Sequence, residues 1–244
     1  MTSKWPVAKL GEVTDIHNGG TPKTGVTAYW DGGLAWVTPA EMGKLSSPYL
    51  AATARTLSTE GMKASNTKLM PANSVIMSSR APIGHLIINT EPMAFNQGCK
   101  GLVPHDVIDH KYMYYFLLSS KAYLNSLGSG TTFAELSAGK LKEVEIPLPP
   151  LDEQKRIVAK LDKALGYVDE LSQQNIRQIN DAKVLHDAFN SELFEQIHAS
   201  TKSTTLGEVA EKVVVGFVGT CAPFYTPEGV PFLRTQNVTK SGID

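Results

Sequence analysis

The residues best suited to chemistry in this 244-residue chain are hydrogen-bond donors in short, turn-rich segments. Arg80 follows Ser78 and Ser79, and an arginine in such a turn can donate two hydrogen bonds to guanine or clamp a phosphate. The alternative is a structural arginine bonded to backbone carbonyls. Asn96 and Gln97 have the amides that read adenine in bidentate fashion, but the same side chains also satisfy backbone groups in half-buried turns.

Two glycine-containing loops offer further contacts to phosphate. Lys23 ends the loop Asn18-Gly-Gly-Thr-Pro-Lys23. The loop that begins at Gly128 carries Ser129, Thr131 and Thr132, whose amides and hydroxyls suit a phosphate oxygen. In the first loop the glycines are also consistent with turn geometry alone, and the second is equally consistent with a helix C-cap followed by a turn.

The sequence holds few signs of catalysis or of metal binding. His105 and His110 have no third ligand at a suitable spacing. Cys99 and Cys221 form no CxxC pair, so neither a disulfide framework nor a zinc site is expected. A GxGxxG cofactor loop and the Asn/Asp-Pro-Pro-aromatic motif of amino-methylating enzymes are both missing, because the Pro-Pro pair at 149–150 is flanked by leucines. These observations disfavour a self-contained methyltransferase.

Composition bounds the class of protein. With 42% hydrophobic residues the chain can bury a core. No apolar run approaches the roughly 18 residues of a membrane span, and the N-terminus lacks the apolar stretch of a secretion signal. We therefore expect a cytoplasmic protein with no membrane partner.

The sequence pattern of residues 1–150 is typical of short strands joined by turns. Leu34–Val37, Ser74–Met77 and His85–Ile88 have strand character, and Gly, Pro, Asn, Ser and Thr separate such runs. Asp109–Leu127 instead carries aromatic and aliphatic residues at helical spacing and is expected to be a helix packed on the sheet. Ile146-Pro-Leu-Pro-Pro150 is a stiff stretch that ends this segment.

A long helix is predicted from Asp152 to about Ile197. The segment contains no proline, and apolar residues recur near one stripe, which is typical of a helix with a narrow apolar seam. Such a seam needs a second helix from elsewhere in the chain or from another chain; the alternative is a charged surface helix stabilised by i,i+4 pairs. The expected pairing residues are Ile157, Leu161, Leu165, Val168, Ile179, Phe189 and Leu193.

The start of the chain is repeated after residue 200. At a constant offset of 196, Leu10-Gly-Glu-Val13 superposes on Leu206-Gly-Glu-Val209, and nine of the 35 positions from Leu10 to Lys44 are identical. Gly20, Thr24, Tyr29, Gly33 and Lys44 account for the other five identities, with Gly216, Thr220, Tyr225, Gly229 and Lys240. We expect one complete domain at 1–150, a spacer helix at 151–200, and the incomplete start of a second copy at 201–244.

Several motifs resemble a known family. Gly19-Gly-Thr-Pro22, Leu34-Ala-Trp-Val-Thr-Pro39, Ser78-Ser-Arg-Ala-Pro-Ile-Gly84 and Pro147-Leu-Pro-Pro-Leu-Asp-Glu-Gln-Lys-Arg-Ile-Val158 occur in this order. They resemble the target recognition domain and the helix entry of type I restriction-modification specificity subunits. The last motif is the most specific, and the resemblance extends over essentially the whole chain.

The resemblance implies an α+β fold, a mixed target recognition domain followed by a long coiled-coil-type helix. It also implies a non-catalytic subunit that binds double-stranded DNA and directs an adenine-N6 methyltransferase subunit and a restriction and translocation subunit to a bipartite target. S-adenosylmethionine, ATP and Mg²⁺ would then bind those partners rather than this chain. The alternative is a coiled-coil interaction module without DNA contact.

Charge is distributed unevenly along the chain. Residues 1–150 carry 13 Lys and Arg against 11 Asp and Glu, whereas residues 151–200 carry 6 against 9. A basic net charge is the usual footprint of a nucleic-acid binder, so the net charge of −1 for the whole chain at first argues against DNA. The acidic residues lie mainly in the helix, however, and the first domain by itself is weakly basic. We expect weak DNA binding by this chain alone, and self-association through the helix, with antiparallel copies placing two domains at opposite ends.

Overall fold

The computed structural model describes residues 4–80, 82–129, 134–202, 204–212, 216, 238–239 and 242–243. The chain divides into two units, 1–175 and 176–244. Residues 4–150, which precede the long helix, are termed the head. In chain order the elements are β1 (Val7–Lys9), α1 (Leu10–Val13), β2 (Thr14–Asn18), η1 (Thr27–Tyr29), β3 (Trp30–Val37), α2 (Pro39–Met42), β4 (Tyr49–Leu50), β5 (Thr56–Leu57), α3 (Thr59–Ala64), β6 (Val75–Ser78), β7 (Leu86–Asn89), β8 (Ala94–Phe95), β9 (Cys99–Pro104), α4 (His110–Ser119), α5 (Lys121–Ser126), α6 (Ala138–Lys142), β10 (Glu145–Pro147), α7 (Leu151–Ser200), α8 (Leu206–Val209), β11 (Val238–Thr239) and β12 (Gly242–Ile243).

The head is built on a five-stranded sheet with the order β2-β9-β6-β7-β4. Its pairs are antiparallel except for β4 and β7, which run parallel. A smaller sheet has the order β5-β3-β8, and β1 pairs with β10. All three runs that the sequence predicted as strands, near Leu34, Ser74 and His85, are confirmed as β3, β6 and β7.

Both faces of the central sheet are buried. Val75 and Met77 of β6 point into one core cluster with α4 and α5, while Ile76 between them belongs to a second cluster on the other face. Because successive side chains of a strand point to opposite faces, the three consecutive apolar residues Val75, Ile76 and Met77 fit a strand that is covered on both sides. Trp30 and Trp36 form a third buried cluster, with their rings edge to face at 5.1 Å.

The helix expected over Asp109–Leu127 packs on the sheet as predicted but is not continuous. Asp109 caps α4 by accepting hydrogen bonds from two backbone amides of the first turn. At Ser120 the backbone leaves the helical region (φ −90°, ψ 7°), and α5 begins at the next residue. The break turns the chain so that Leu117 and Leu124, from different helices, both enter the same core cluster.

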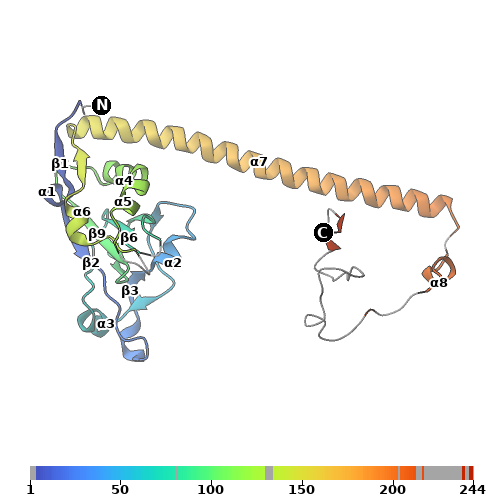
Figure 1. The fold of residues 1–244 in the computed structure, drawn as a ribbon, viewed down its shortest axis with the longest axis horizontal. Helices are drawn as coiled ribbons and strands as arrows, with labels where there is room; N and C mark the ends of the chain where they lie inside the picture. The colour runs from blue at the N-terminus through green and yellow to red at the C-terminus, as the bar shows by residue number, and fades with distance from the viewer. Residues whose placement is uncertain are drawn as a thin grey trace, which may run out of the picture. The chain divides into compact units, whose positions relative to one another are not determined.

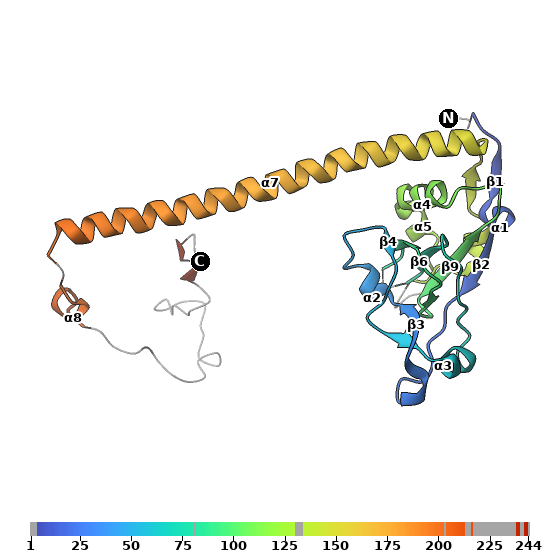
Figure 2. The same cartoon turned by 180° about the vertical axis from the view of Figure 1, so that it is seen from behind.

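The long helix α7 starts on the head, where its first residues are anchored (Figures 1 and 2). The Gln154 side chain is fully buried; it accepts a hydrogen bond from the Asp109 amide and donates to the carbonyls of Val107 and Pro149. Val158 belongs to the head core. These contacts explain why the motif that ends at Val158 marks the entry into the helix.

One turn further along α7, a carboxylate fixes the helix against α4. Asp162 accepts hydrogen bonds from the Lys111 ammonium and from the Tyr115 hydroxyl, both at 2.5 Å. The two donors come from neighbouring turns of α4, so together with Gln154 they fix how the first turns of α7 lie on the head. Among the described residues no helix is long and apolar enough to cross a membrane.

The repeated sequence forms the same local structure twice. Leu10–Val13 and Leu206–Val209 are each a four-residue helix. In the first copy the Glu12 carboxylate accepts a hydrogen bond from the Lys9 amide, and in the second Glu208 accepts one from the Thr205 amide. Gly216 is described, whereas Thr220, Tyr225, Gly229 and Lys240 lie outside the described residues, as does Cys221.

Candidate functional site

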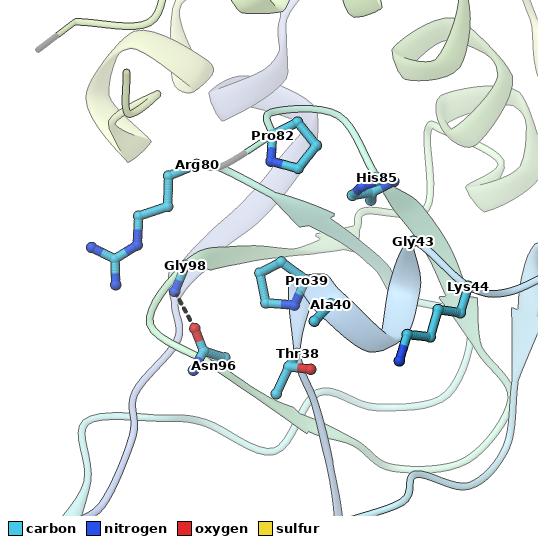
Figure 3. Close-up of a pocket in the computed structure, with 10 residues that line it drawn as sticks. All are labelled: Thr38, Pro39, Ala40, Gly43, Lys44, Arg80, Pro82, His85, Asn96 and Gly98. Carbon is cyan, nitrogen blue, oxygen red and sulfur yellow. Dashed lines mark hydrogen bonds between the residues drawn. The ribbon is translucent and has the colours of Figure 1, made fainter. Parts of the chain in front are cut away.

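An open cleft of about 390 Å³ on the head gathers cationic and polar side chains from three parts of the chain (Figure 3). Helix α2 and its N-cap, Thr38, form one wall, the segment that links β6 to β7 forms another, and the turn between β8 and β9 forms the third. The residues that line the cleft are Thr38, Pro39, Ala40, Gly43, Lys44, Arg80, Pro82, His85, Asn96 and Gly98.

Arg80 is the cleft residue that sequence reasoning singled out most clearly, and the structure gives it a partner other than backbone carbonyls. Its guanidinium lies 3.8 Å from the Glu135 carboxylate, which also accepts a hydrogen bond from the buried Lys100 ammonium at 3.3 Å. No described residue accepts a hydrogen bond from the guanidinium. The side chain is 35% exposed, so its planar set of donors remains available to a ligand in the cleft.

Glycine at position 98 allows Arg80 to lie across the turn between β8 and β9. A Cβ added at Gly98 would meet Nε of Arg80 and Oδ1 of Asn96, each at 3.2 Å. Asn96 holds the same turn, because its side-chain oxygen accepts a hydrogen bond from the Gly98 amide at 2.7 Å (Figure 3). Its NH₂ group donates to the Thr21 hydroxyl at 2.9 Å. The Asn96 amide therefore has the structural role that was the alternative to reading adenine.

Ser78 and Ser79 support Arg80 from inside the head. Both are fully buried, so the structure does not bring their hydroxyls to the surface as DNA contacts. The Ser78 hydroxyl donates to the Pro82 carbonyl and accepts from the His85 amide, which closes the segment between β6 and β7. The Ser79 hydroxyl has no hydrogen-bond partner among the described residues, whereas its backbone bonds to Gly98 and Leu136.

The remaining predicted contacts lie at different places. Gln97 and Lys23 are exposed, but neither lines the cleft. Ser129 is exposed, and its backbone pairs with that of Glu135, which also forms a bridge to Arg80. Glu135 thus brings Ser129 and Arg80 together. Thr131 and Thr132 lie outside the described residues.

Two of the residues that line the cleft were not predicted from the sequence. Lys44 follows α2 and is exposed, and His85 begins the chain segment that enters β7. Burial, followed by the positive charge of Lys121, lowers the pKa of His85 below its ordinary value, so at neutral pH its ring is uncharged and both donates and accepts hydrogen bonds. In Figure 3 Arg80 and Lys44 lie on opposite sides of Pro39 and Ala40. The cleft can therefore hold an anionic group or the polar edge of a base.

The pairing residues predicted on α7 fall into three groups. Ile157 is half-buried and packs against the head core, so part of its side chain is covered within this chain. Leu161 and Leu165 line an apolar groove with α4. The other four are exposed, from 41% to 62%: Val168, Ile179, Phe189 and Leu193.

Comparisons with known proteins agree with this fold. The type I restriction modification DNA specificity domain matches residues 2–181. A type I restriction enzyme MjaIX specificity subunit of Methanocaldococcus jannaschii is 28% identical over 257 residues, covering 97% of this chain and 58% of the relative. The EcoR124I/EcoR124II specificity subunit of Escherichia coli is 29% identical over 196 residues, covering 76% of this chain and 47% of the relative.

Two solved structures are also similar. An HsdS subunit from Thermoanaerobacter tengcongensis gives a TM-score of 0.57 at 26% identity and covers 71% of this chain and 40% of that one. A chain from a study of complex assembly and conformational transition of the type I R-M system gives 0.64 at 27% identity, with 77% and 45% covered. The fold class is therefore α+β, with a head that continues into a long helix. The chain belongs to the family of type I restriction modification DNA specificity domains, and it spans about half the length of the relatives it matches.

Proposed function

We propose that the head binds double-stranded DNA sequence-specifically at the cleft around Arg80 and that the chain acts as a non-catalytic specificity subunit. The observation that carries the proposal is the Arg80 guanidinium, which lies 3.8 Å from the Glu135 carboxylate at the edge of an open cleft, with its hydrogen-bond donors unused by described residues. An arginine whose donors are free at the edge of a cleft suits bidentate recognition of guanine or of phosphate. Family membership supports duplex DNA as the ligand.

The proposed partners supply the catalytic chemistry. We infer an adenine-N6 methyltransferase subunit, which would bind S-adenosylmethionine, and a restriction and translocation subunit, which would use ATP and Mg²⁺. The relatives' names, type I restriction enzyme specificity subunits, support such an assembly. In it, this chain would select the DNA sequence for the other subunits.

We also propose that α7 pairs with α7 of a second copy. From Lys163 to Ser200 every residue of the helix is exposed except the half-buried Asn190, yet the seam remains apolar. A narrow apolar seam of this length is typical of a helix with a partner. Two identical heads related by a twofold axis would read inverted half-sites, whose spacing follows from the geometry of the spacer.

The test is a fluorescence titration of duplex DNA with the full chain at several salt concentrations. Binding should weaken as salt rises, by about 0.9 in log affinity per unit of log salt for each phosphate contacted. Arg80→Ala should weaken binding to a selected sequence about 5- to 150-fold, which corresponds to the loss of one bidentate base contact. Lys63→Ala, an exposed residue of α3 outside the cleft, is the matched control and should bind as the wild type does.

Two outcomes of this titration would overturn the proposal. If the wild type shows no DNA binding even at low salt, the alternative of a coiled-coil interaction module would be favoured. If Arg80→Ala and Lys63→Ala bind the selected sequence equally well, the head would bind DNA elsewhere than at this cleft.

A further inference from the structure

The carboxylate beside Arg80 is kept in place by a buried lysine. Lys100 lies in β9, between Asn18 of β2 and Met77 of β6, and only 5% of its side chain is exposed. Its ammonium donates a hydrogen bond to Oε1 of Glu135 at 3.3 Å, and no other described residue accepts one from it. Because a buried charge without a partner is strongly disfavoured, Glu135 cannot turn away from Lys100 without a large cost.

The backbone also places Glu135 next to Arg80. The two residues form an antiparallel bridge, and Glu135 forms a second one with Ser129. One residue further on, the Leu136 amide donates to the Ser79 carbonyl at 2.9 Å. Oε2 of Glu135 lies 3.8 Å from Nη1 of Arg80, and no described residue donates a hydrogen bond to this oxygen. The two side chains are 35% and 42% exposed, so a ligand can reach both.

Arg80 and Glu135 therefore place two donors and one acceptor side by side. Across the major groove a G·C pair presents the acceptors N7 and O6 of guanine and then the N4 amine of cytosine as a donor. An A·T pair presents an acceptor, a donor and an acceptor in that order. O6 and N4 are joined by a base-pair hydrogen bond of about 2.9 Å, so the groups that contact them stand close together, as Nη1 and Oε2 do.

We infer that Glu135 is a specificity-determining residue of the head and that, together with Arg80, it reads one G·C pair. Arg80 donates to O6 and N7 of the guanine, with Nη1 on O6, and Oε2 of Glu135 accepts from N4 of the paired cytosine. Lys100 is a positioning residue, since it acts on the base only through Glu135. The inference rests on the proposed binding of duplex DNA at this cleft and adds the base pair that the cleft selects.

The carboxylate also disfavours other ligands of Arg80. With an A·T pair in the same place, the adenine amine would meet a donor of Arg80, and O4 of thymine would meet Oε2 of Glu135. Unpaired and repelling groups of this kind are a source of specificity. A phosphate beside Arg80 would lie close to the negative charge of Glu135, which repels it. Of the two ligands that suit Arg80, guanine is therefore favoured over phosphate.

Titration of the full chain with duplexes that differ at one base pair tests the inference. The position is the one at which Arg80→Ala loses its preference in selected sequences. Two base analogues each remove one hydrogen bond of the G·C pair. Pyrimidin-2-one lacks the N4 amine of cytosine in the major groove, whereas inosine lacks the guanine amine in the minor groove. Inosine is the matched control, because it leaves the major-groove edge unchanged.

The wild type should bind the pyrimidin-2-one duplex at least about fivefold more weakly than the G·C duplex, which is the low end of what a base contact contributes. It should bind the inosine duplex as tightly as the G·C duplex. Equal affinity for the two analogue duplexes would overturn the inference. So would selection of a pair other than G·C at the position that depends on Arg80.

Two variants assign the contact with the amine to Glu135. Lys100→Met/Glu135→Met removes both charges together and leaves no unpaired buried ammonium, and it should bind the G·C and pyrimidin-2-one duplexes equally. Lys100→Met alone keeps the carboxylate and should still distinguish them. Glu91→Met removes the same charge from an exposed position outside the cleft and should behave as the wild type does. Discrimination that persists in the double variant would overturn the inference, and the wild-type titration decides it if that variant does not fold.

Failure of the proposed function gives a different result from failure of this inference. A wild type that binds no duplex at low salt, or that binds all sequences equally, overturns both. A wild type that prefers one sequence through Arg80 but binds the two analogue duplexes equally overturns only the role of Glu135.

Discussion

The first turns of α7 and the rest of the same helix carry apolar residues at similar spacing but bury them very differently. Val158 is 7% exposed and sits in the head core, whereas Leu185 is 72% exposed. The first turns also have polar anchors, Gln154 and Asp162, that bond to the head. Among the described residues, residues 166–175 of α7 make no hydrogen bond or ion pair with the head.

The difference shows that one sequence pattern serves two purposes along a single helix. In the first turns the apolar residues complete the core of a folded head, and further along they form a surface that has to be covered by another helix. Helical propensity and i,i+4 pairs stabilise an isolated helix only marginally, so the exposed part gains most of its stability from a partner. Substitutions in the two parts should therefore affect different measurements.

The largest effect is expected for Gln154→Ala. This substitution leaves the Asp109 amide and the carbonyls of Val107 and Pro149 without their partner in a buried place, and each unsatisfied group costs about 1–3 kcal/mol. We expect the head to lose about 3 kcal/mol in its free energy of unfolding, measured with urea. Gln174→Ala, in the exposed part of α7, should change it by less than about 0.5 kcal/mol. Equal effects at the two positions would mean that the first turns are not anchored.

The next effect concerns self-association rather than folding. Phe189→Asp places a charge in the seam and should raise the dissociation constant of the dimer by at least about tenfold, since burial of one large side chain contributes about 1.5–3 kcal/mol. Sedimentation measures the constant. Gln174→Asp, on the side of the helix away from the seam, adds the same charge and should leave the dimer intact. A dimer equally weakened by both substitutions would point to net charge, not to the seam.

Leu161 lies at the boundary between the two parts and should affect both measurements. It is 36% exposed and lines the groove next to α4. Truncation of a fully buried leucine costs about 2–5 kcal/mol, so for this half-covered one we expect Leu161→Ala to cost about 1 kcal/mol of head stability and to weaken the dimer several-fold. Leu185→Ala should weaken the dimer only. If Leu161→Ala changed neither quantity, the groove would not be part of either contact.

The smallest effect is a pH dependence at Asp162. Burial alone would raise the pKa of this carboxyl, but hydrogen bonds from Lys111 and Tyr115 outweigh burial and lower the pKa below 3.8. The stabilisation is therefore present above pH 3.8 and is lost as the pH falls through the lowered pKa of the folded state. Asp162→Asn should cost about 0.5–1 kcal/mol at pH 7, with a difference from the wild type that shrinks in acid. Asp181→Asn, in the exposed part, should show no difference at any pH.

The elements of the head and the long helix could be predicted from the sequence because their patterns are local. Strands β3, β6 and β7 and helix α7 follow from runs and periods that a few neighbouring residues define. The break at Ser120 was not predictable, since α4 and α5 together carry one continuous helical pattern. Ser78 and Ser79 looked accessible beside Arg80, but a strand with both faces buried has no polar face to reveal which way its hydroxyls point.

The candidate site was predictable only in part, because its geometry depends on contacts between distant residues. Arg80 was identified from its type and its turn-rich setting. Its partner Glu135 is 55 positions further along the chain, and Lys44 and His85 enter the cleft through the packing of α2 and β7. Nothing local in the sequence distinguishes these residues from other surface charges. Ile157 was assigned to the seam by spacing, although tertiary packing places it against the head.

The most direct test of recognition by two paired heads is selection of duplexes from a randomised DNA pool by the full chain at low salt. The wild type should enrich two inverted copies of one short sequence at a fixed separation, and Phe189→Asp should enrich a single copy. Arg80→Ala should lose the preference at the base that Arg80 contacts. Enrichment of no sequence by the wild type, or of the same inverted pair by Phe189→Asp, would contradict the proposal.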